Sequence, residues 1–392
     1  MSILLTGGDG YLGWPAALRI AKRTDDRVVL VDNFARREWV EEVGSVSAVP
    51  IASIDERIEA AEEVHGITNL SFVEGDLTEK AFVDQLLEVH EPDTIVHTAA
   101  QPSAPYSQIN GERANYTQHN NLQATRNLLW GLEEHDMTDA HFVETTTTGV
   151  YGAPEFPIPE GGSTMTNQGE EDEVPFPAMA GSWYHLTKSH DAANMRLAHR
   201  QFDIPISDVR TAITYGTEVE ETRADDRLKT RFDFDYYFGV VAHRFAAQAV
   251  AGYPVTVYGK GEQRKPFIAL EDAVEGLAQL ATMDPDERPS EHVVYNQVTR
   301  AISIVEMANT IADVGSEHGL DVDVEHFENP RDEDETHKME IENDRYAALI
   351  GGQDQTFEEG IEDVFASLTS YAERIEARED RFLPGVLEPD EE

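Results

Sequence analysis

The sequence predicts a doubly wound α/β fold, a parallel sheet with helices on both faces, followed by a smaller, mostly helical C-terminal domain. Two observations carry this prediction. Short apolar runs alternate with amphipathic helical stretches through the first half of the chain. After about residue 214 the alternation gives way to an irregular pattern rich in helical signals. The chain has 392 residues, 40% of them apolar, which is enough for two domains.

The expected elements follow one another in βαβ order. The strands are near-continuous apolar runs, as in buried parallel sheets, at 2–6, 27–32, 70–76, 94–99, 141–146 and 206–213. Helical spacing is expected at about 12–22, 79–89, 113–134, 184–202, 236–251, 271–283, 303–317 and 357–376. The segment 152–182 carries several Pro and Gly without a clear period, so we expect a long loop there.

Composition excludes several classes of protein. The 76 acidic and 30 basic residues give a net charge of −46, which disfavours nucleic acids and anionic membranes as partners. Salt relieves such self-repulsion, so the charge predicts adaptation to a salt-rich cytoplasm. The absence of cysteine excludes disulfides and thiolate chemistry. No apolar run approaches the roughly 20 residues of a spanning helix, and the opening MSILLTGG lacks a basic n-region, so a cytoplasmic protein is expected.

A glycine-rich turn follows the first predicted strand. Gly7, Gly10 and Gly13 have the spacing that lets a backbone approach a pyrophosphate at a helix N-terminus. Asp32 ends the second strand about twenty residues on, where a carboxylate binds ribose hydroxyls, and Asp76 follows the third strand. These features predict a Rossmann-type dinucleotide site.

The predicted cofactor is NAD, because the Asp32 carboxylate repels the 2′-phosphate of NADP. Arg36 and Arg37 are the opposing signal and receive less weight. The predicted cofactor residues are Gly7, Gly10, Tyr11, Leu12, Gly13, Asp32, Asn33, Arg36, Asp76, Leu77 and Lys188. Residues 1–213, with 268–300 returning to them, form the expected NAD-binding domain. Residues 214–267 and 301–392 form the expected substrate domain.

A catalytic pair is predicted in the string YHLTK. Tyr184 and Lys188 are four residues apart at the start of a helix and hence share a face. An ammonium beside a phenol, together with a nicotinamide cation, lowers the tyrosine pKa, so Tyr184 can take a proton from a sugar hydroxyl. Thr147, in the strand end TTTTGVYG, is expected to hydrogen-bond the same hydroxyl.

These motifs resemble those of the extended short-chain dehydrogenase/reductase superfamily of nucleotide-sugar enzymes. Longer strings make the resemblance narrower, and over nearly the whole chain they resemble the UDP-sulfoquinovose synthase family. The strings are GGDGYLGWP at 7–15, VDNFARR at 31–37, PIASIDERI at 50–58, SAPYS at 103–107, YTQHNN at 116–121, RFDFD at 231–235, YYFGVV at 236–241, TVYGKGEQ at 256–263 and NPR at 329–331.

The resemblance implies a defined reaction on UDP-glucose and sulfite. The sugar is oxidised at C4 by tightly held NAD, water is eliminated across C5–C6, sulfite adds at C6, and hydride returns to C4. Tyr184 is then the base, and His185 assists proton transfer at C5/C6 or contacts the sulfonate. The implied substrate residues are Gln101, Ser103, Tyr106, Arg244, Gln263 and Arg331. No metal is expected, and helices 113–134 and 184–202 are expected to form a homodimer interface.

The chain departs from the family pattern at several positions. Pro102 stands where the family has an arginine, and Lys265, with Arg264 beside it, stands where another arginine is usual. Thr148 and Gly149 occupy the positions of the acids of 4,6-dehydratases, which argues against that activity. A UDP-sugar 4-epimerase, which needs only the Tyr/Lys/Thr set, is the main alternative. A non-catalytic NAD-binding regulator is a third, and an intact Tyr/Lys/Thr set argues against it.

Overall fold

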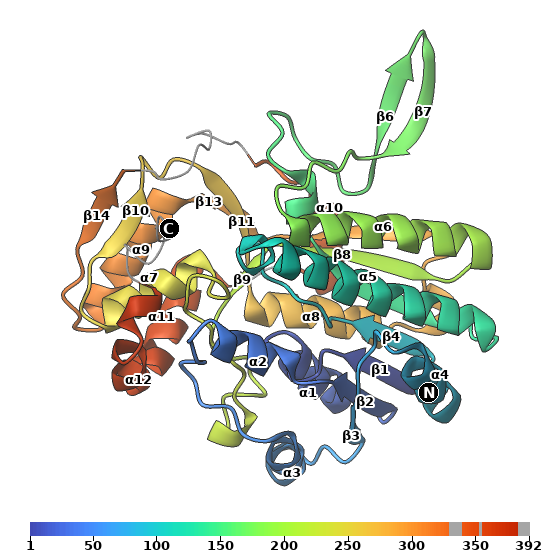
Figure 1. Ribbon diagram of the computed structural model, residues 1–392, viewed down its shortest axis with the longest axis horizontal. Coiled ribbons are helices and arrows are strands. Elements are labelled where there is room, and N and C mark those ends of the chain that lie inside the picture. The colour runs from blue at the N-terminus through green and yellow to red at the C-terminus, as the bar shows by residue number, and fades with distance from the viewer. Residues whose placement is uncertain (329–338, 353–354, 383–392) are drawn as a thin grey trace.

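Seven parallel strands form the central sheet of the computed structural model, which describes residues 1–328, 339–352 and 355–382 (Figure 1). In spatial order the strands are β12 (His292–Gln297), β8 (Ile206–Thr211), β5 (His141–Thr147), β4 (Thr94–His97), β1 (Ser2–Thr6), β2 (Arg27–Asp32) and β3 (Leu70–Glu74). The order reverses between β1 and β4. In sheets of this kind a crevice for ligands opens at that point, beyond the carboxyl ends of the strands.

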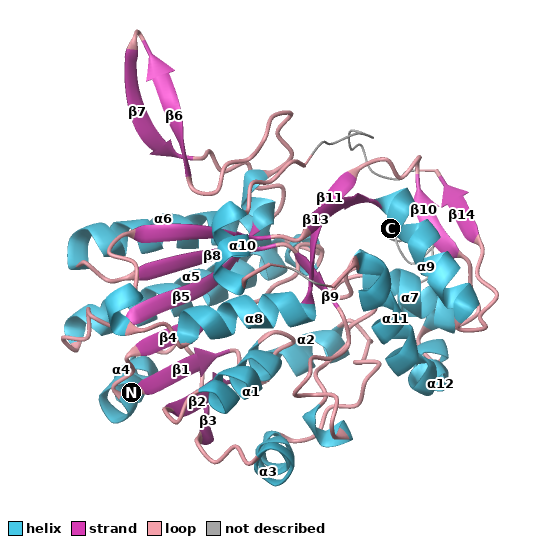
Figure 2. Cartoon of the chain, turned by 180° about the vertical axis from the view of Figure 1, so that it is seen from behind, coloured by secondary structure: helices cyan, strands magenta, loops and turns pink. Residues whose placement is uncertain are grey.

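Helices cover both faces of the sheet (Figure 2), and neighbouring residues of a strand pack toward opposite layers. Ile3 and Leu5 pack toward α1 (Gly13–Arg23) and α8 (Leu270–Ala281). Leu4 packs toward the other layer, formed by α4 (Lys80–His90), α5 (Gly111–Glu134) and α6 (Trp183–Phe202). Both faces of the sheet are therefore buried, which explains why its strands have continuous apolar runs. The predicted doubly wound fold is confirmed.

A second core lies beyond the carboxyl ends of the strands. It is built on α7 (Val241–Val250), α9 (Ile304–Glu317) and α11 (Phe357–Leu368). Two small sheets belong to this part: β9 (Ile213–Tyr215), β11 (Arg264–Ala269) and β13 (Arg300–Ser303) form one, and β10 (Val255–Tyr258) pairs with β14 (Val324–Phe327) in the other. Between β11 and β13 the chain returns to the large sheet, where it forms α8 and β12. The domain boundaries given above stay a prediction.

Several elements differ from the sequence-based expectation. The helices α2 (Ala35–Glu42), α3 (Ile54–His65) and α10 (Asp344–Ile350) were not predicted, and the helix predicted over 357–376 is divided into α11 and α12 (Ala372–Glu376). The helix expected from residue 236 begins at Val241, because the Asp235 carboxylate accepts the N–H groups of Tyr237 (2.8 Å) and Phe238 (2.9 Å) and holds a turn there. None of the helices in the described part of the chain has the length and apolar character to cross a membrane.

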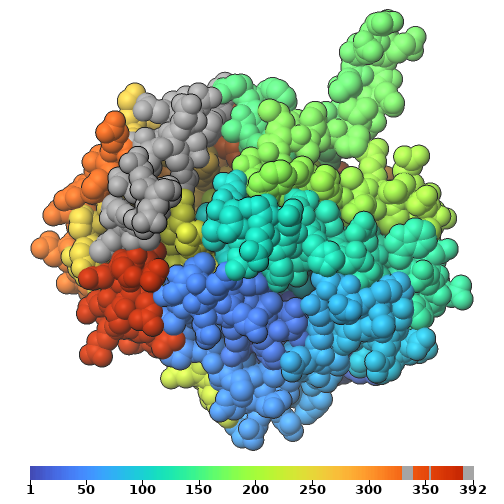
Figure 3. All heavy atoms as spheres, viewed as in Figure 1, coloured from blue at the N-terminus to red at the C-terminus, as the bar shows by residue number. Residues whose placement is uncertain are grey.

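The prediction of a structureless loop over 152–182 is wrong in its central part. Strands β6 (Gly162–Asn167) and β7 (Glu170–Pro175) form a hairpin that stands off the body of the protein (Figure 3). Gln168 and Gly169 both have positive φ, as a two-residue hairpin turn requires. The acidic strand EEDEV has low β propensity, which hid the hairpin. At its base the Glu160 carboxylate accepts N–H groups from Asn296, Arg345 and Tyr346.

Removal of the hairpin is expected to leave the fold intact. Residues 163–174 are deleted and Gly162, which pairs with Pro175, is joined to it directly. Because nearly all of the deleted side chains are exposed, the expected change in Tm is below about 2 °C. Thermal unfolding followed by circular dichroism measures it. A fall of more than about 5 °C would show instead that the hairpin stabilises the body of the protein.

Candidate active site

The turn between β1 and α1 is held in one conformation by close backbone contacts. Gly7 has φ +80° and donates its N–H to the Val31 carbonyl (2.8 Å). A Cβ atom on Gly13 would lie 1.9 Å from the Gly7 carbonyl oxygen, so only glycine fits there. The predicted turn therefore has the conformation that exposes a helix N-terminus to a phosphate group.

A buried charge cluster supports this turn from behind, and the sequence did not indicate it. Asp9 is 1% exposed and forms ion pairs with Arg37 (2.6 Å) and Arg57 (3.0 Å). The Arg57 guanidinium also lies 4.1 Å from the Trp14 ring centroid, and burial lowers its pKa to about 9. Arg57 lies in the string PIASIDERI, which resembles the family, but that resemblance suggested no role for Arg57.

The residues around the turn fit NAD. One Asp32 oxygen accepts the N–H of Asp9 (2.9 Å) and the other that of Phe34 (2.7 Å), so the carboxyl faces the cavity in a fixed orientation. Burial raises the pKa of Asp32. Arg36 pairs with Asp233 (2.6 Å) and Arg37 pairs with Asp9. Carboxylates neutralise both arginines. The two arginines are therefore no argument for NADP, whose 2′-phosphate would need their positive charge.

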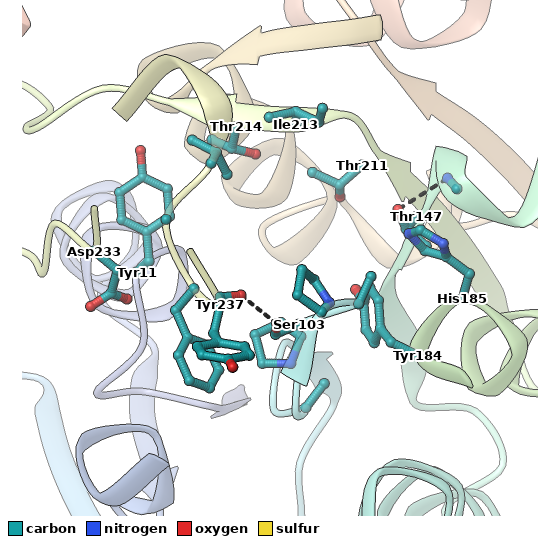
Figure 4. Close-up of a pocket in the computed structure, with 18 of the residues that line it drawn as sticks. Tyr11, Ser103, Thr147, Tyr184, His185, Thr211, Ile213, Thr214, Asp233 and Tyr237 are labelled. Carbon is teal, nitrogen blue, oxygen red and sulfur yellow. Dashed lines mark hydrogen bonds between the residues drawn. The ribbon is translucent and has the colours of Figure 1, made fainter. Parts of the chain in front are cut away.

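One large cavity, with a volume of about 1210 Å³, extends from the glycine turn across the carboxyl ends of the strands to β11 (Figure 4). In Figure 4, Thr147, Tyr184 and His185 lie on one side of this cavity, and Tyr11 and Asp233 lie on the other. All predicted cofactor and catalytic residues line it: Gly7, Gly10, Tyr11, Leu12, Gly13, Asp32, Asn33, Arg36, Asp76, Leu77, Thr147, Tyr184, His185 and Lys188. The volume is sufficient for a cofactor and a substrate side by side.

The predicted catalytic residues come from two neighbouring elements. Thr147 ends β5, and its hydroxyl accepts the N–H of Gly149 (3.1 Å). Tyr184 lies in the first turn of α6, where its N–H bonds to the Ser107 hydroxyl (3.1 Å). The Ser182 hydroxyl caps this helix by accepting the N–H of His185 (3.0 Å). These hydrogen bonds hold the end of β5, which carries Thr147, and the first turn of α6, which carries Tyr184.

The ionisation of Tyr184 depends on opposing influences. Burial raises the pKa of Tyr184, and the charge of Lys188 lowers it. Asp191 and Glu144 act against Lys188 and raise the tyrosine pKa further. The predicted lowering by Lys188 is thus present, but in this structure the pKa of Tyr184 is raised overall. The two carboxyl groups, which the sequence analysis did not consider, account for part of this difference.

His185 is neutral at physiological pH. Burial lowers its pKa to about 4, and the positive charge of Lys265 on β11 contributes. Its ring packs over Gly149, where a Cβ atom would lie 2.4 Å from the imidazole. A neutral imidazole can accept a proton but offers no positive charge to an anion. Of the two predicted roles, the structure therefore favours proton transfer over contact with a sulfonate.

The predicted substrate residues divide into three groups. Ser103, Arg244 and Gln263 line the cavity, as does Pro102. Gln101 and Tyr106 are fully buried behind its wall, where Gln101 bonds to Thr117 (3.1 Å) and the Tyr106 hydroxyl donates to Glu42 (2.8 Å). Both therefore support the wall, and the expectation that they touch substrate is corrected. Arg331 lies outside the described residues.

Other residues of the cavity wall were missed as site residues. The string YYFGVV forms a loop along the cavity and was expected to be helical. Gly239 allows this course, because a Cβ atom there would lie 2.5 Å from the Phe234 backbone. Arg381, which no motif indicated, also lines the cavity, as does Lys265, the lysine that stands in place of a family arginine. A family-like string located YYFGVV, but its contacts arise from distant parts of the chain.

The sheet, the glycine turn and the Tyr/Lys/Thr set define an NAD-dependent nucleotide-sugar enzyme. In agreement with this class, residues 3–296 of the chain match the NAD dependent epimerase/dehydratase family. The chain is 37% identical to the UDP-sulfoquinovose synthase of Sulfolobus acidocaldarius, over 98% of this chain and 96% of that protein. It is 36% identical to the chloroplastic UDP-sulfoquinovose synthase of Spinacia oleracea, over 98% of this chain and 78% of that protein. The chain belongs to the UDP-sulfoquinovose synthase family.

Solved structures of the same fold are more distant in sequence. A UDP-glucose 4-epimerase from Stenotrophomonas maltophila, solved with bound NAD, has a TM-score of 0.71 at 18% identity and covers 96% of this chain and 99% of its own. A UDP-glucose 4-epimerase from Thermotoga maritima has a TM-score of 0.68 at 18% identity, covering 95% and 99%. These likenesses show the fold, and the family match supports NAD as the cofactor.

The close contact at Gly13 leads to a prediction. Gly13→Ala forces the turn open, because the new Cβ atom would overlap the Gly7 carbonyl. We expect at least a tenfold loss of NAD affinity and a loss of stability of about 1–3 kcal/mol, as for overpacked sites. Gly111→Ala, at a position with no atom within 4 Å, is the control. Calorimetric titration with NAD and thermal unfolding measure both effects. Equal affinities for the two variants would contradict the role assigned to the turn.

Proposed function

We propose that this protein makes UDP-sulfoquinovose from UDP-glucose and sulfite, releasing water. The observation that carries the proposal is the identity of 36–37% to two UDP-sulfoquinovose synthases over nearly the whole chain. The Tyr/Lys/Thr set on the cavity wall supports it. When bound, NAD takes up a hydride from C4 of the sugar and later returns it.

Tyr184 and Thr147 act at the C4 hydroxyl. Thr147 positions the hydroxyl, and the Tyr184 phenolate takes its proton as C4 is oxidised. The same phenol returns the proton when C4 is reduced, so Tyr184 ends the cycle as it began. Lys188 favours the phenolate electrostatically.

His185 acts at the neighbouring carbons. A carbonyl group at C4 acidifies the C5 hydrogen, and a neutral imidazole can take this proton and pass it to the C6 hydroxyl group, which leaves as water. Bisulfite then adds through its sulfur to C6 of the resulting alkene, and the proton that it brings goes to C5. The low pKa of His185 keeps the imidazole unprotonated at the start of this step.

The cations of the cavity fit two anionic groups. Arg244 and Gln263 are assigned to the diphosphate of the UDP moiety, since guanidinium groups match phosphate oxygens. Lys265 lies close enough to His185 to influence its pKa, and it is assigned to sulfite in place of the arginine that Pro102 replaces.

We also propose a homodimer through α5 and α6. Trp130 on α5 and Leu197 on α6 are about half exposed, and both helices are long enough for a four-helix interface. A UDP-sugar 4-epimerase is the second candidate function, favoured by Pro102, because an epimerase needs no sulfite site.

Product analysis separates the two functions. The protein is incubated with UDP-glucose, with and without sulfite, in concentrated salt, and the products are identified by mass spectrometry and chromatography. A UDP-sugar carrying a sulfonate, formed only with sulfite, is expected. UDP-galactose formed equally without sulfite would point to the epimerase instead.

Replacement of the base gives a second prediction. Tyr184→Phe removes the group that takes the C4 proton, so the rate of product formation is expected to fall by about 10²–10⁴-fold. NAD remains bound, because the phenol does not hold the cofactor turn. Tyr253→Phe, at a half-buried position that does not line the cavity, is the control. Substantial turnover by Tyr184→Phe would remove Tyr184 from the mechanism.

A further inference from the structure

The catalytic lysine lies between two carboxyl groups. The Lys188 ammonium is 3.0 Å from Glu144 Oε1 on β5 and 3.4 Å from Asp191 Oδ2, one turn further along α6. The side chains of Glu144 and Asp191 are completely buried, and that of Lys188 is 3% exposed. The ammonium is therefore fixed from behind, on the side away from the cavity.

The charges of this triad do not balance if all three groups are ionised. One cation and two carboxylates leave one negative charge in a buried site, which is costly without a further partner. Glu144 Oε2 has no hydrogen-bond donor among the described residues. Neither Asp191 carboxyl oxygen has a hydrogen-bond donor there either, so a proton on one of the two carboxyl groups is what offsets the second negative charge. The geometry thus indicates a carboxyl pair that holds one proton.

The surroundings of the pair supply little further positive charge. Thr125 on α5 places its hydroxyl 3.3 Å from Glu144 Oε1 and 3.3 Å from His97 Nε2 on β4. Burial keeps the pKa of His97 well below its ordinary value, so that ring is neutral. Asp208 on β8 adds a negative charge, which raises the pKa of Glu144, and Arg210 is bound to Asp208 (3.0 Å).

We propose that Glu144 and Asp191 are positioning residues that share one proton and so control when Lys188 can favour the Tyr184 phenolate. This inference rests on the proposed role of Tyr184 as the base. While the pair keeps its proton, the triad is neutral and the ammonium acts on Tyr184 with only one opposing charge. When the proton is lost, the triad becomes negative and opposes ionisation of Tyr184.

The proposal fixes the direction of a shift. In Glu144→Gln the amide can keep the contact with Lys188, but the triad stays neutral at every pH, so Tyr184 ionises more readily. The rising limb of kcat/KM against pH is expected to move about one unit lower, the size of shift that a nearby charge produces. Asp191→Asn is expected to move it in the same direction. A merely structural role would lower activity without moving the limb.

The kinetic control is a partly buried carboxyl group outside the triad. Glu160→Gln changes a side chain whose pKa burial also raises, but which contacts β12 and α10 instead of the triad. Its profile is expected to coincide with that of the unaltered protein. Unmoved limbs in both Glu144→Gln and Asp191→Asn would overturn the proposal.

Two readouts need no turnover and so separate this proposal from the proposed function. Ultraviolet difference titration against Tyr184→Phe reports the tyrosinate directly, and its midpoint is expected to fall by about one unit in Glu144→Gln. The second readout is stability. Burial raises the pKa of Glu144 from 4.5 to about 8, so the folded state holds a proton that the unfolded state releases. The Tm of the unaltered protein relative to Glu144→Gln is therefore expected to fall as pH rises through this range.

The outcomes are distinct. A shifted tyrosinate midpoint with no sulfonated product supports the carboxyl pair and rejects the proposed function. A sulfonated product with an unshifted midpoint, and a Tm difference that is constant with pH, supports the function and rejects the pair.

Discussion

The buried contact between Asp9 and Arg57 is the interaction on which the cofactor turn and its neighbours depend. Asp9 lies inside the glycine turn, its N–H orients Asp32, and its carboxylate binds Arg57 from α3. Arg57 also donates to the Lys229 carbonyl (3.3 Å), so the same guanidinium reaches the segment leading into the second core. Removing one partner of such a pair costs about 3–5 kcal/mol, because it leaves an uncompensated buried charge.

The acidic composition makes each cation of the cavity informative. The chain has only 30 Lys and Arg, and several of those near the site are bound to carboxylates: Arg36 to Asp233, Arg37 to Asp9, and Lys188 to Glu144. These pairs are buried or partly buried, so salt screens them less than it screens the acidic surface. The electrostatic interactions of the site therefore depend less on salt concentration than those of the acidic surface do.

The motif residues predicted at strand ends lie together on the cavity wall. The carboxyl ends of parallel strands meet at one edge, so the glycine turn, Asp32, Asp76 and Thr147 could be brought together by reasoning from the strands alone. Gln101 and Tyr106 follow β4 in the same way, but their side chains turn into the protein. Which side of a loop faces the cavity depends on its packing partners, here Thr117 and Glu42, and a single sequence does not show these.

The sequence by itself determined the alternation of strands and helices in the first half of the chain, the cofactor turn and the Tyr184/Lys188 pair, because these depend on periodicity and short spacings within one or two elements. Only the tertiary structure decided the ionisation of Tyr184 and Lys188. Glu144 lies 44 residues before Lys188 in the chain, yet it is 3.0 Å from the ammonium. The parallel pairing of β5 and the packing of α6 against it create that contact. Burial of the contact then makes one proton on a carboxyl group matter to Tyr184.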